Sequence, residues 1–138
     1  MIKVDIPNKE INKLLRDLTK YGEEQEQKTK HNLEESGLKI ESDAKLDLTK
    51  NAHVDTGRLR SSVHMESSTT NRNYTYSDGT GNSFNGSLGV NPDNLEVYIG
   101  TNVEYAEKIR RIDDFLFPYA EQERVRLIAR LKKQLAEA

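Results

Sequence analysis

The sequence predicts an α+β fold in a single domain of 138 residues. Residues 1–53 have the apolar spacing of helices, including one long helix. Residues 54–103 alternate apolar and polar positions over short stretches, which predicts a small antiparallel sheet of about three or four strands with a long hairpin at 67–94. Residues 104–138 return to helical spacing and predict closing helices, the last of which is a C-terminal helix.

Two helices are predicted in the N-terminal part. Apolar residues at positions i, i+3, i+4 and i+7 indicate a helix that begins near Asn8, and a long helix follows from about Glu23 to Asn51. The apolar stripe of the long helix begins only at Leu33, so its first turns are expected to be solvated or to lie against another subunit. Gly37 lies within the stripe and costs about 1 kcal/mol relative to alanine, which favours close packing against the helix backbone.

The segment Val54-Asp55-Thr56-Gly57-Arg58-Leu59 separates helical from sheet-like sequence and predicts a sharp turn. Its aspartate and threonine carry short acceptors that bond nearby backbone N–H groups, and its glycine enters the positive-φ region. Alternation from Leu59 to Met65 predicts a half-buried strand, after a first helical turn. Residues 95–100 alternate in the same way and predict another strand.

Between these strands, residues 67–94 are rich in Ser, Thr, Asn and Gly. Residues that favour strands lie on both sides of the turn at Ser77–Asn82, so a hairpin with two strand arms is predicted. The arm residues are Tyr74, Tyr76, Phe84, Leu88 and Val90. We expect few apolar contacts to hold this hairpin, so that its tip is mobile in the isolated chain and becomes ordered against a neighbour.

After the second strand, Tyr105–Ile109 has the pattern of one or two helical turns. Pro118 fits the first turn of a final helix, because the missing N–H has no intrahelical partner at that position. Five residues are expected to pack these helices against the sheet. They are Tyr105, Ala106, Phe115, Phe117 and Pro118.

Composition excludes several function classes. Hydrophobic residues make up 34% and charged residues 32% of the chain, so we expect a small core and a fold completed partly by partners. The net charge of −2 argues against a generally basic nucleic-acid binder. The lack of cysteine excludes disulfides and thiolate chemistry. No apolar run approaches the roughly 20 residues that span a bilayer, so a cytoplasmic protein without membrane contact is expected.

The sequence gives no convincing pattern for a metal, cofactor or catalytic site. His53, Asp55 and His64 are close in sequence, but their spacing does not specify a shared site. Gly79-Thr80-Gly81 lacks the Gly-Lys-Ser/Thr of a phosphate-binding loop. Two alternatives stay open: a small enzyme that uses His53 and Asp55 as acid and base, and a nucleic-acid-binding regulator that acts through the basic C-terminal helix.

Three segments in fixed order carry a family resemblance. They are Val54-Asp55-Thr56-Gly57-Arg58-Leu59, Gly100-Thr101-Asn102-Val103-Glu104-Tyr105-Ala106 and Phe115-Leu116-Phe117-Pro118. With a long helix before them and a variable hairpin between the first two, the chain resembles the head–tail joining, or tail completion, proteins of long-tailed bacteriophages.

The resemblance implies assembly rather than catalysis. It implies a structural virion protein of the neck, made in the host cytoplasm, that forms a ring of its own copies and can be a monomer before assembly. The implied partners are head connector or adaptor proteins and tail terminator or tail tube proteins, with DNA passing through the ring without specific binding. We expect five residues to contact partners: Arg58, Arg60, Tyr76, Asp78 and Phe84.

Overall fold

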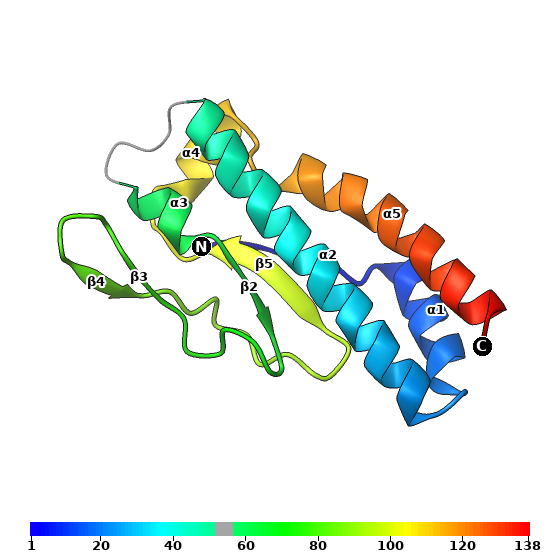
Figure 1. The fold of residues 1–138 in the computed structure, drawn as a ribbon. Coiled ribbons are helices and arrows are strands. Elements are labelled where there is room, and N and C mark those ends of the chain that lie inside the picture. The colour runs from blue at the N-terminus through cyan, green and yellow to red at the C-terminus, as the bar shows by residue number, and fades with distance from the viewer. Residues whose placement is uncertain (52–56) are drawn as a thin grey trace.

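The computed structural model describes residues 1–51 and 57–138, and it confirms the predicted α+β fold class (Figure 1). The helices of these described residues are α1 (Lys9–Thr19), α2 (Glu23–Lys50), α3 (Arg58–Ser62), α4 (Ala106–Ile112) and α5 (Phe117–Ala136). The strands are β1 (Ile2–Asp5), β2 (His64–Ser67), β3 (Thr75–Ser77), β4 (Ser83–Asn85) and β5 (Val97–Thr101).

The main sheet has three antiparallel strands in the order β1-β5-β2. Ile99 in the central strand pairs with Val4 on one side and with Met65 on the other. Helix α2 packs on β2 and β5 and also contacts α1 and α5, which contact each other (Figure 1). Strands β3 and β4 form a separate two-stranded sheet at the end of the molecule away from α1.

Strand β1 is a correction to the sequence analysis, which treated residues 1–53 as helical. Ile2 and Val4 are buried and Lys3 is exposed, so the strand does alternate, but over only four residues. Its stability comes from pairing with β5, almost a hundred residues later in the chain. A local pattern this short does not distinguish a strand from an irregular N-terminus.

Gly37 has the close packing that its place in the apolar stripe predicts. A Cβ atom at this position would lie 2.5 Å from Met65 Cγ and 2.9 Å from Val97 Cγ1. The missing side chain therefore lets α2 approach β2 and β5 closely. The polar first turns of α2, before the buried Thr29, are largely exposed, as predicted.

Replacing Gly37 by alanine is expected to destabilise the protein by about 1–2 kcal/mol. The overpacking cost of about 1–3 kcal/mol exceeds the gain of up to about 1 kcal/mol in helix propensity. Urea denaturation measures the difference, with Ser42→Ala on the exposed side of the same helix as the control. A more stable Gly37→Ala protein would show that the helix can move away from the sheet at little cost.

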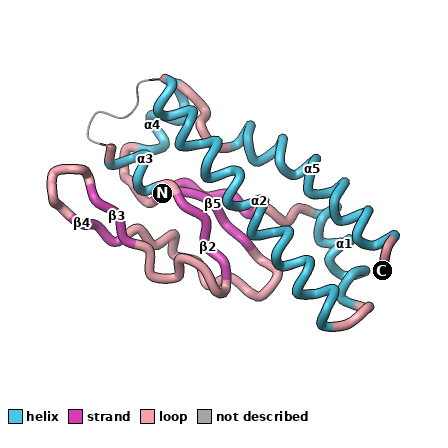
Figure 2. The backbone as a smooth tube through the Cα atoms, in the orientation of Figure 1, coloured by secondary structure: helices cyan, strands magenta, loops and turns pink. Residues whose placement is uncertain are grey.

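The second face of the main sheet is covered by residues 68–95, which connect β2 to β5 (Figure 2). Met65 faces α2, so its neighbours His64 and Glu66 point to this second face. Both are buried, and every residue of β2 is buried, which corrects the half-buried strand predicted from sequence. Leu88 is fully buried, and Tyr74 stacks on the ring of His64.

The hairpin is better anchored than the sequence analysis expected. Tyr76 is only 7% exposed, and its ring stacks on Phe84 at a centroid distance of 5.2 Å. The Tyr74 hydroxyl donates to the Ser61 carbonyl over 2.6 Å, and the Asn102 amide donates to the Asn85 carbonyl over 2.7 Å. The expectation of few apolar contacts is therefore wrong for the base of the hairpin.

Candidate functional site

Arg58 joins the predicted corner segment to the segment that follows β5. Its guanidinium donates two hydrogen bonds to the Glu104 carboxylate, at 2.9 and 3.0 Å. It also lies 4.4 Å from the ring centroid of Phe84 and 5.8 Å from that of Tyr105. The hydrogen bond to Glu104, with a further one to Tyr76, raises the pKa of Arg58 above its ordinary value. We call these five residues the arginine cluster; it connects the corner, the hairpin and the start of α4.

The corner itself is described from Gly57 onward. Gly57 has φ of 74° and stands directly before α3, so it has the left-handed conformation predicted for the turn. Leu59 is 3% exposed and belongs to the core. Val54, Asp55 and Thr56, and also His53, lie outside the described residues.

The five residues predicted to contact partners lie in different environments. Arg58 is paired within its own chain, and Tyr76 is buried within strand β3 of the hairpin. Phe84 is half-buried against both. Arg60 donates to the Thr49 hydroxyl at 3.3 Å across to α2. Asp78 lies at the hairpin tip, between β3 and β4, and is partly exposed.

The hairpin tip is organised by Asp78. Its carboxylate accepts bonds from the Thr80 N–H and hydroxyl and from the Asn82 amide, over 2.8, 2.5 and 3.1 Å. These bonds, first of all the one from the Thr80 hydroxyl, lower the pKa of Asp78 to about 2. Gly79 and Gly81 have φ of 80° and 98°, so the tip needs glycine at both positions.

The residues predicted to pack the closing helices lie at or close to the N-terminal ends of α4 and α5. Ala106 and Phe115 are fully buried. Phe117 is half-buried and its ring lies 5.0 Å from the Arg110 guanidinium. Pro118 occupies the first turn of α5, as predicted. Tyr105, which precedes α4, and Pro118 are both exposed, so the packing predicted for these two residues is wrong.

A polar cluster that sequence reasoning missed lies behind the hairpin, between β2 and the segment that covers it. His64 is fully buried, with Nδ1 at 2.7 Å from the Ser62 carbonyl and Nε2 at 2.7 Å from Glu66 Oε2. The Leu88 N–H donates to the same Glu66 oxygen over 2.9 Å. Both ring nitrogens of His64 therefore have a hydrogen-bond partner, although the ring is fully buried. The ring of His64 also stacks on that of Tyr74 at a centroid distance of 3.9 Å.

A chain of hydroxyl groups continues from this cluster into β5. Ser62 donates to the Leu59 carbonyl over 2.6 Å, so its hydroxyl oxygen accepts from Thr101 over 2.5 Å. Thr101 in turn accepts from the Val103 N–H over 3.0 Å. The chain fixes α3 against the end of β5, next to the arginine cluster. Alternation placed Ser62, His64 and Glu66 on the polar face, and sequence alone does not show that this face is covered.

Comparison of the chain with family models, curated proteins and solved structures gives no significant match.

Cations of α5 are largely engaged within the chain. Arg124 donates to the backbone carbonyls of Asp5 and Ile6 over 2.5 and 3.0 Å. Arg130 donates to Ser36 over 2.5 Å and lies 3.6 Å from the buried Glu123.

No helix within the described ranges is long and apolar enough to cross a membrane. Within the same ranges, no group of three His, Cys, Asp or Glu residues could hold a metal ion.

Asp5, at the end of β1, has a perturbed carboxyl group. Its Oδ1 is buried, with no hydrogen-bond partner among the described residues. Burial, and then the negative charge of Glu96, raise the pKa of Asp5 to about 6, although the positive charge of Arg124 opposes them. The folded state therefore holds a proton on Asp5 more tightly than the unfolded chain, in which the carboxyl has its ordinary pKa of 3.8.

Asp5→Asn is expected to stabilise the protein near pH 7 and to have little effect near about pH 4. The raised pKa stabilises the folded state below the unfolded value, and this stabilisation is lost as the pH rises through the folded value of about 6. Thermal unfolding of both proteins across this range measures the difference in Tm. Asp17→Asn, at an exposed position of α1, is the control. A Tm difference that is constant with pH would contradict the raised pKa.

Proposed function

We propose that this protein is a structural subunit of the head–tail interface of a long-tailed bacteriophage. Copies of the chain form a ring that helps to join the connector of the DNA-filled head to the tail. Its implied partners are head connector or adaptor proteins on one side and tail terminator or tail tube proteins on the other. The role is assembly, without a catalytic step, and its location is the neck of the virion.

The arginine cluster is the observation that carries the proposal. Arg58 comes from the Asp-Thr-Gly-Arg-Leu segment, while Glu104 and Tyr105 come from the Gly-Thr-x-x-Glu-Tyr-Ala segment. These are two of the three segments on which the family resemblance depends, and they meet in one contact although 46 positions separate Arg58 from Glu104. Their side chains thus have a shared structural task, which supports the view that their joint occurrence is not accidental.

The shape of the chain gives further support. The β3–β4 hairpin extends beyond the helical layer at the end opposite to α1 (Figure 1). A ring needs a head-to-tail contact, in which a surface of one subunit meets a different surface of the next. A hairpin that is anchored at its base by Tyr74 and Tyr76 and has a hydrogen-bonded tip is suited to such a contact, because little conformational entropy is lost on binding.

Shortening the hairpin tests this function. Residues 78–82 are replaced by Asn-Gly, which favours a two-residue turn and keeps the pairing of Ser77 with Ser83. We expect a folded protein that leaves heads and tails unjoined, counted by electron microscopy of particles from cells that make the phage. Alanine at the exposed Arg16 and at Asp17, far from the hairpin, is the matched control and should give joined particles.

Two results would count against the proposal in different ways. Normal joining by the shortened protein would exclude the hairpin as a contact. A wild-type chain that is missing from purified particles, and that forms no ring when mixed with isolated heads, would overturn the neck function itself.

A further inference from the structure

The outer side of α2 has an apolar stripe that is left uncovered by residues 1–51 and 57–138. Leu38 and Leu46 are 49% and 53% exposed, and the exposed Ser42 lies between them at a spacing of four residues. Residues four apart lie on the same side of a helix. A single exposed leucine is ordinary, but two of them around a small residue form a stripe that another helix could cover.

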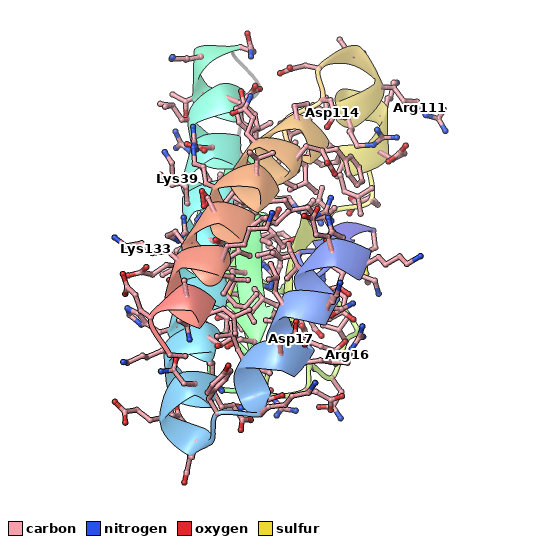
Figure 3. All side chains as sticks on the ribbon, turned by 90° about the vertical axis from the view of Figure 1, so that its right-hand side faces the viewer. Arg16, Asp17, Lys39, Arg111, Asp114 and Lys133 are labelled. Carbon is pink, nitrogen blue, oxygen red and sulfur yellow. The ribbon has the colours of Figure 1, made fainter. Side chains whose placement is uncertain are left out.

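Charged residues border the stripe on both sides. Lys39 and Asp43 form an ion pair of 2.9 Å on one flank, and Lys45 and Glu41 form one of 3.7 Å on the other. Figure 3 shows Lys39 on the outer side of α2, away from α1. Each flank therefore carries one positive and one negative group. Neither flank has a net charge that would repel a second copy of the same surface.

Charges at the ends of the stripe select the direction of such a pairing. Glu35 is exposed about two turns before Ser42, and Lys50 is exposed about two turns after it. Two parallel copies in register would bring Glu35 close to Glu35 of the second copy, which is unfavourable. Two antiparallel copies centred on Ser42 would instead bring Glu35 close to Lys50 of the second copy at both ends.

We propose that α2 docks on α2 of a second copy of this chain, antiparallel, with a twofold axis at Ser42. Leu38 of each copy then packs beside Leu46 of the other, and both ends gain an opposite-charge pair. Because each copy uses the same surface, the contact closes at two copies. It is distinct from the head-to-tail contact of a ring, and the inference does not depend on the proposed function. The contact is small, so the dimer forms reversibly and at high concentration.

Cysteine cross-linking tests the register, because the chain has no cysteine of its own. Packed helices with axes about 8–10 Å apart bring facing Cα atoms within the range of about 4.4–6.8 Å that a disulfide needs. Ser42→Cys is expected to form a disulfide-linked dimer on mild oxidation. Glu35→Cys and Thr49→Cys should each stay monomeric alone but form a dimer when mixed, because the antiparallel register makes these positions face each other.

Each cross-linking outcome decides the proposal. A failure of Ser42→Cys to dimerise at high protein concentration would overturn it. Efficient dimers of Glu35→Cys alone would indicate a parallel pairing and would overturn the antiparallel register.

Sedimentation equilibrium gives a second test on cysteine-free protein. Leu46→Glu is expected to raise the dissociation constant of the dimer at least about tenfold, because a charge replaces an apolar contact at both ends. Val125→Glu on α5, where the valine is 70% exposed, is the matched control and should leave the dissociation constant unchanged. Equal dissociation constants for Leu46→Glu and the wild type, or a wild type that is monomeric throughout, would overturn the proposal. Circular dichroism checks that each variant is folded.

Discussion

Glu66→Ala is expected to destabilise the protein by about 2–5 kcal/mol, because it leaves the ring of the buried His64 without its hydrogen-bond partner. Glu66 Oε2 accepts from His64 over 2.7 Å and from the Leu88 N–H over 2.9 Å, so its removal also leaves a buried backbone donor unsatisfied. The covering segment and the main sheet are joined at this carboxylate. We therefore expect the loss to affect the attachment of residues 68–95 first.

Two measurements check this prediction. Denaturant unfolding gives the change in free energy, and hydrogen exchange at the Leu88 amide shows whether the covering segment opens before the rest. Glu107→Ala is the control, because it removes the exposed ion pair with Arg110 and should cost at most about 1 kcal/mol. Replacing both His64 and Glu66 by leucine should cost less than Glu66→Ala, since no imidazole without its partner then remains buried. A loss below about 1 kcal/mol for Glu66→Ala would mean that the cluster does not hold the segment.

The buried cluster also affects how the hairpin could work in assembly. A hairpin without contacts at its base would be flexible, and it would lose conformational entropy when it binds a partner. Here the base of the hairpin is fixed by Tyr74, which stacks on His64 and donates to Ser61. The proposed contact arm therefore has a preformed orientation, and variants of His64 or Glu66 should weaken joining indirectly, by releasing that orientation.

Periodicity in the sequence was sufficient to locate the longer helices and two strands of the main sheet. The stripes of α1, α2 and α5 and the alternation in β2 and β5 all arise from local spacing, which the sequence shows directly. Gly37 was also interpretable, because a costly residue inside an apolar stripe implies a neighbour at close range. The helix-propensity cost of this one glycine thus predicted a tertiary contact, namely the close packing of α2 against the sheet.

Non-local contacts account for what the sequence did not predict. Strand β1 is stable only because β5 lies beside it, and His64 and Glu66 are buried only because residues 68–95 return over the sheet. A polar residue on the outer face of a strand looks the same in sequence whether water or a loop covers it. The sequence also did not show that Arg58 pairs with Glu104, which was named only as part of one of the segments that carry the family resemblance.

Phe115→Ala is expected to cost about 3–5 kcal/mol, as large aromatic truncations in a core do. Phe115 is fully buried and is among the largest buried side chains of the described residues. The space that it leaves is bordered by rigid elements, because the connector before α5 is held by bonds from the N–H groups of Leu116 and Phe117 to Asp114 Oδ1, at 3.1 and 3.0 Å. Such a site cannot collapse fully around the cavity.

Phe117→Ala is the matched control, because it removes the same side chain two residues away. Phe117 is half-buried and contacts Arg110 at the surface, so its truncation should cost clearly less than that of Phe115. Urea denaturation of both variants gives the comparison. Equal losses would mean that the two phenylalanines share one environment and that the connector packs differently. A larger loss at Phe115 alone would establish that this residue fastens α5 to the core, whereas Phe117 contributes mainly at the surface.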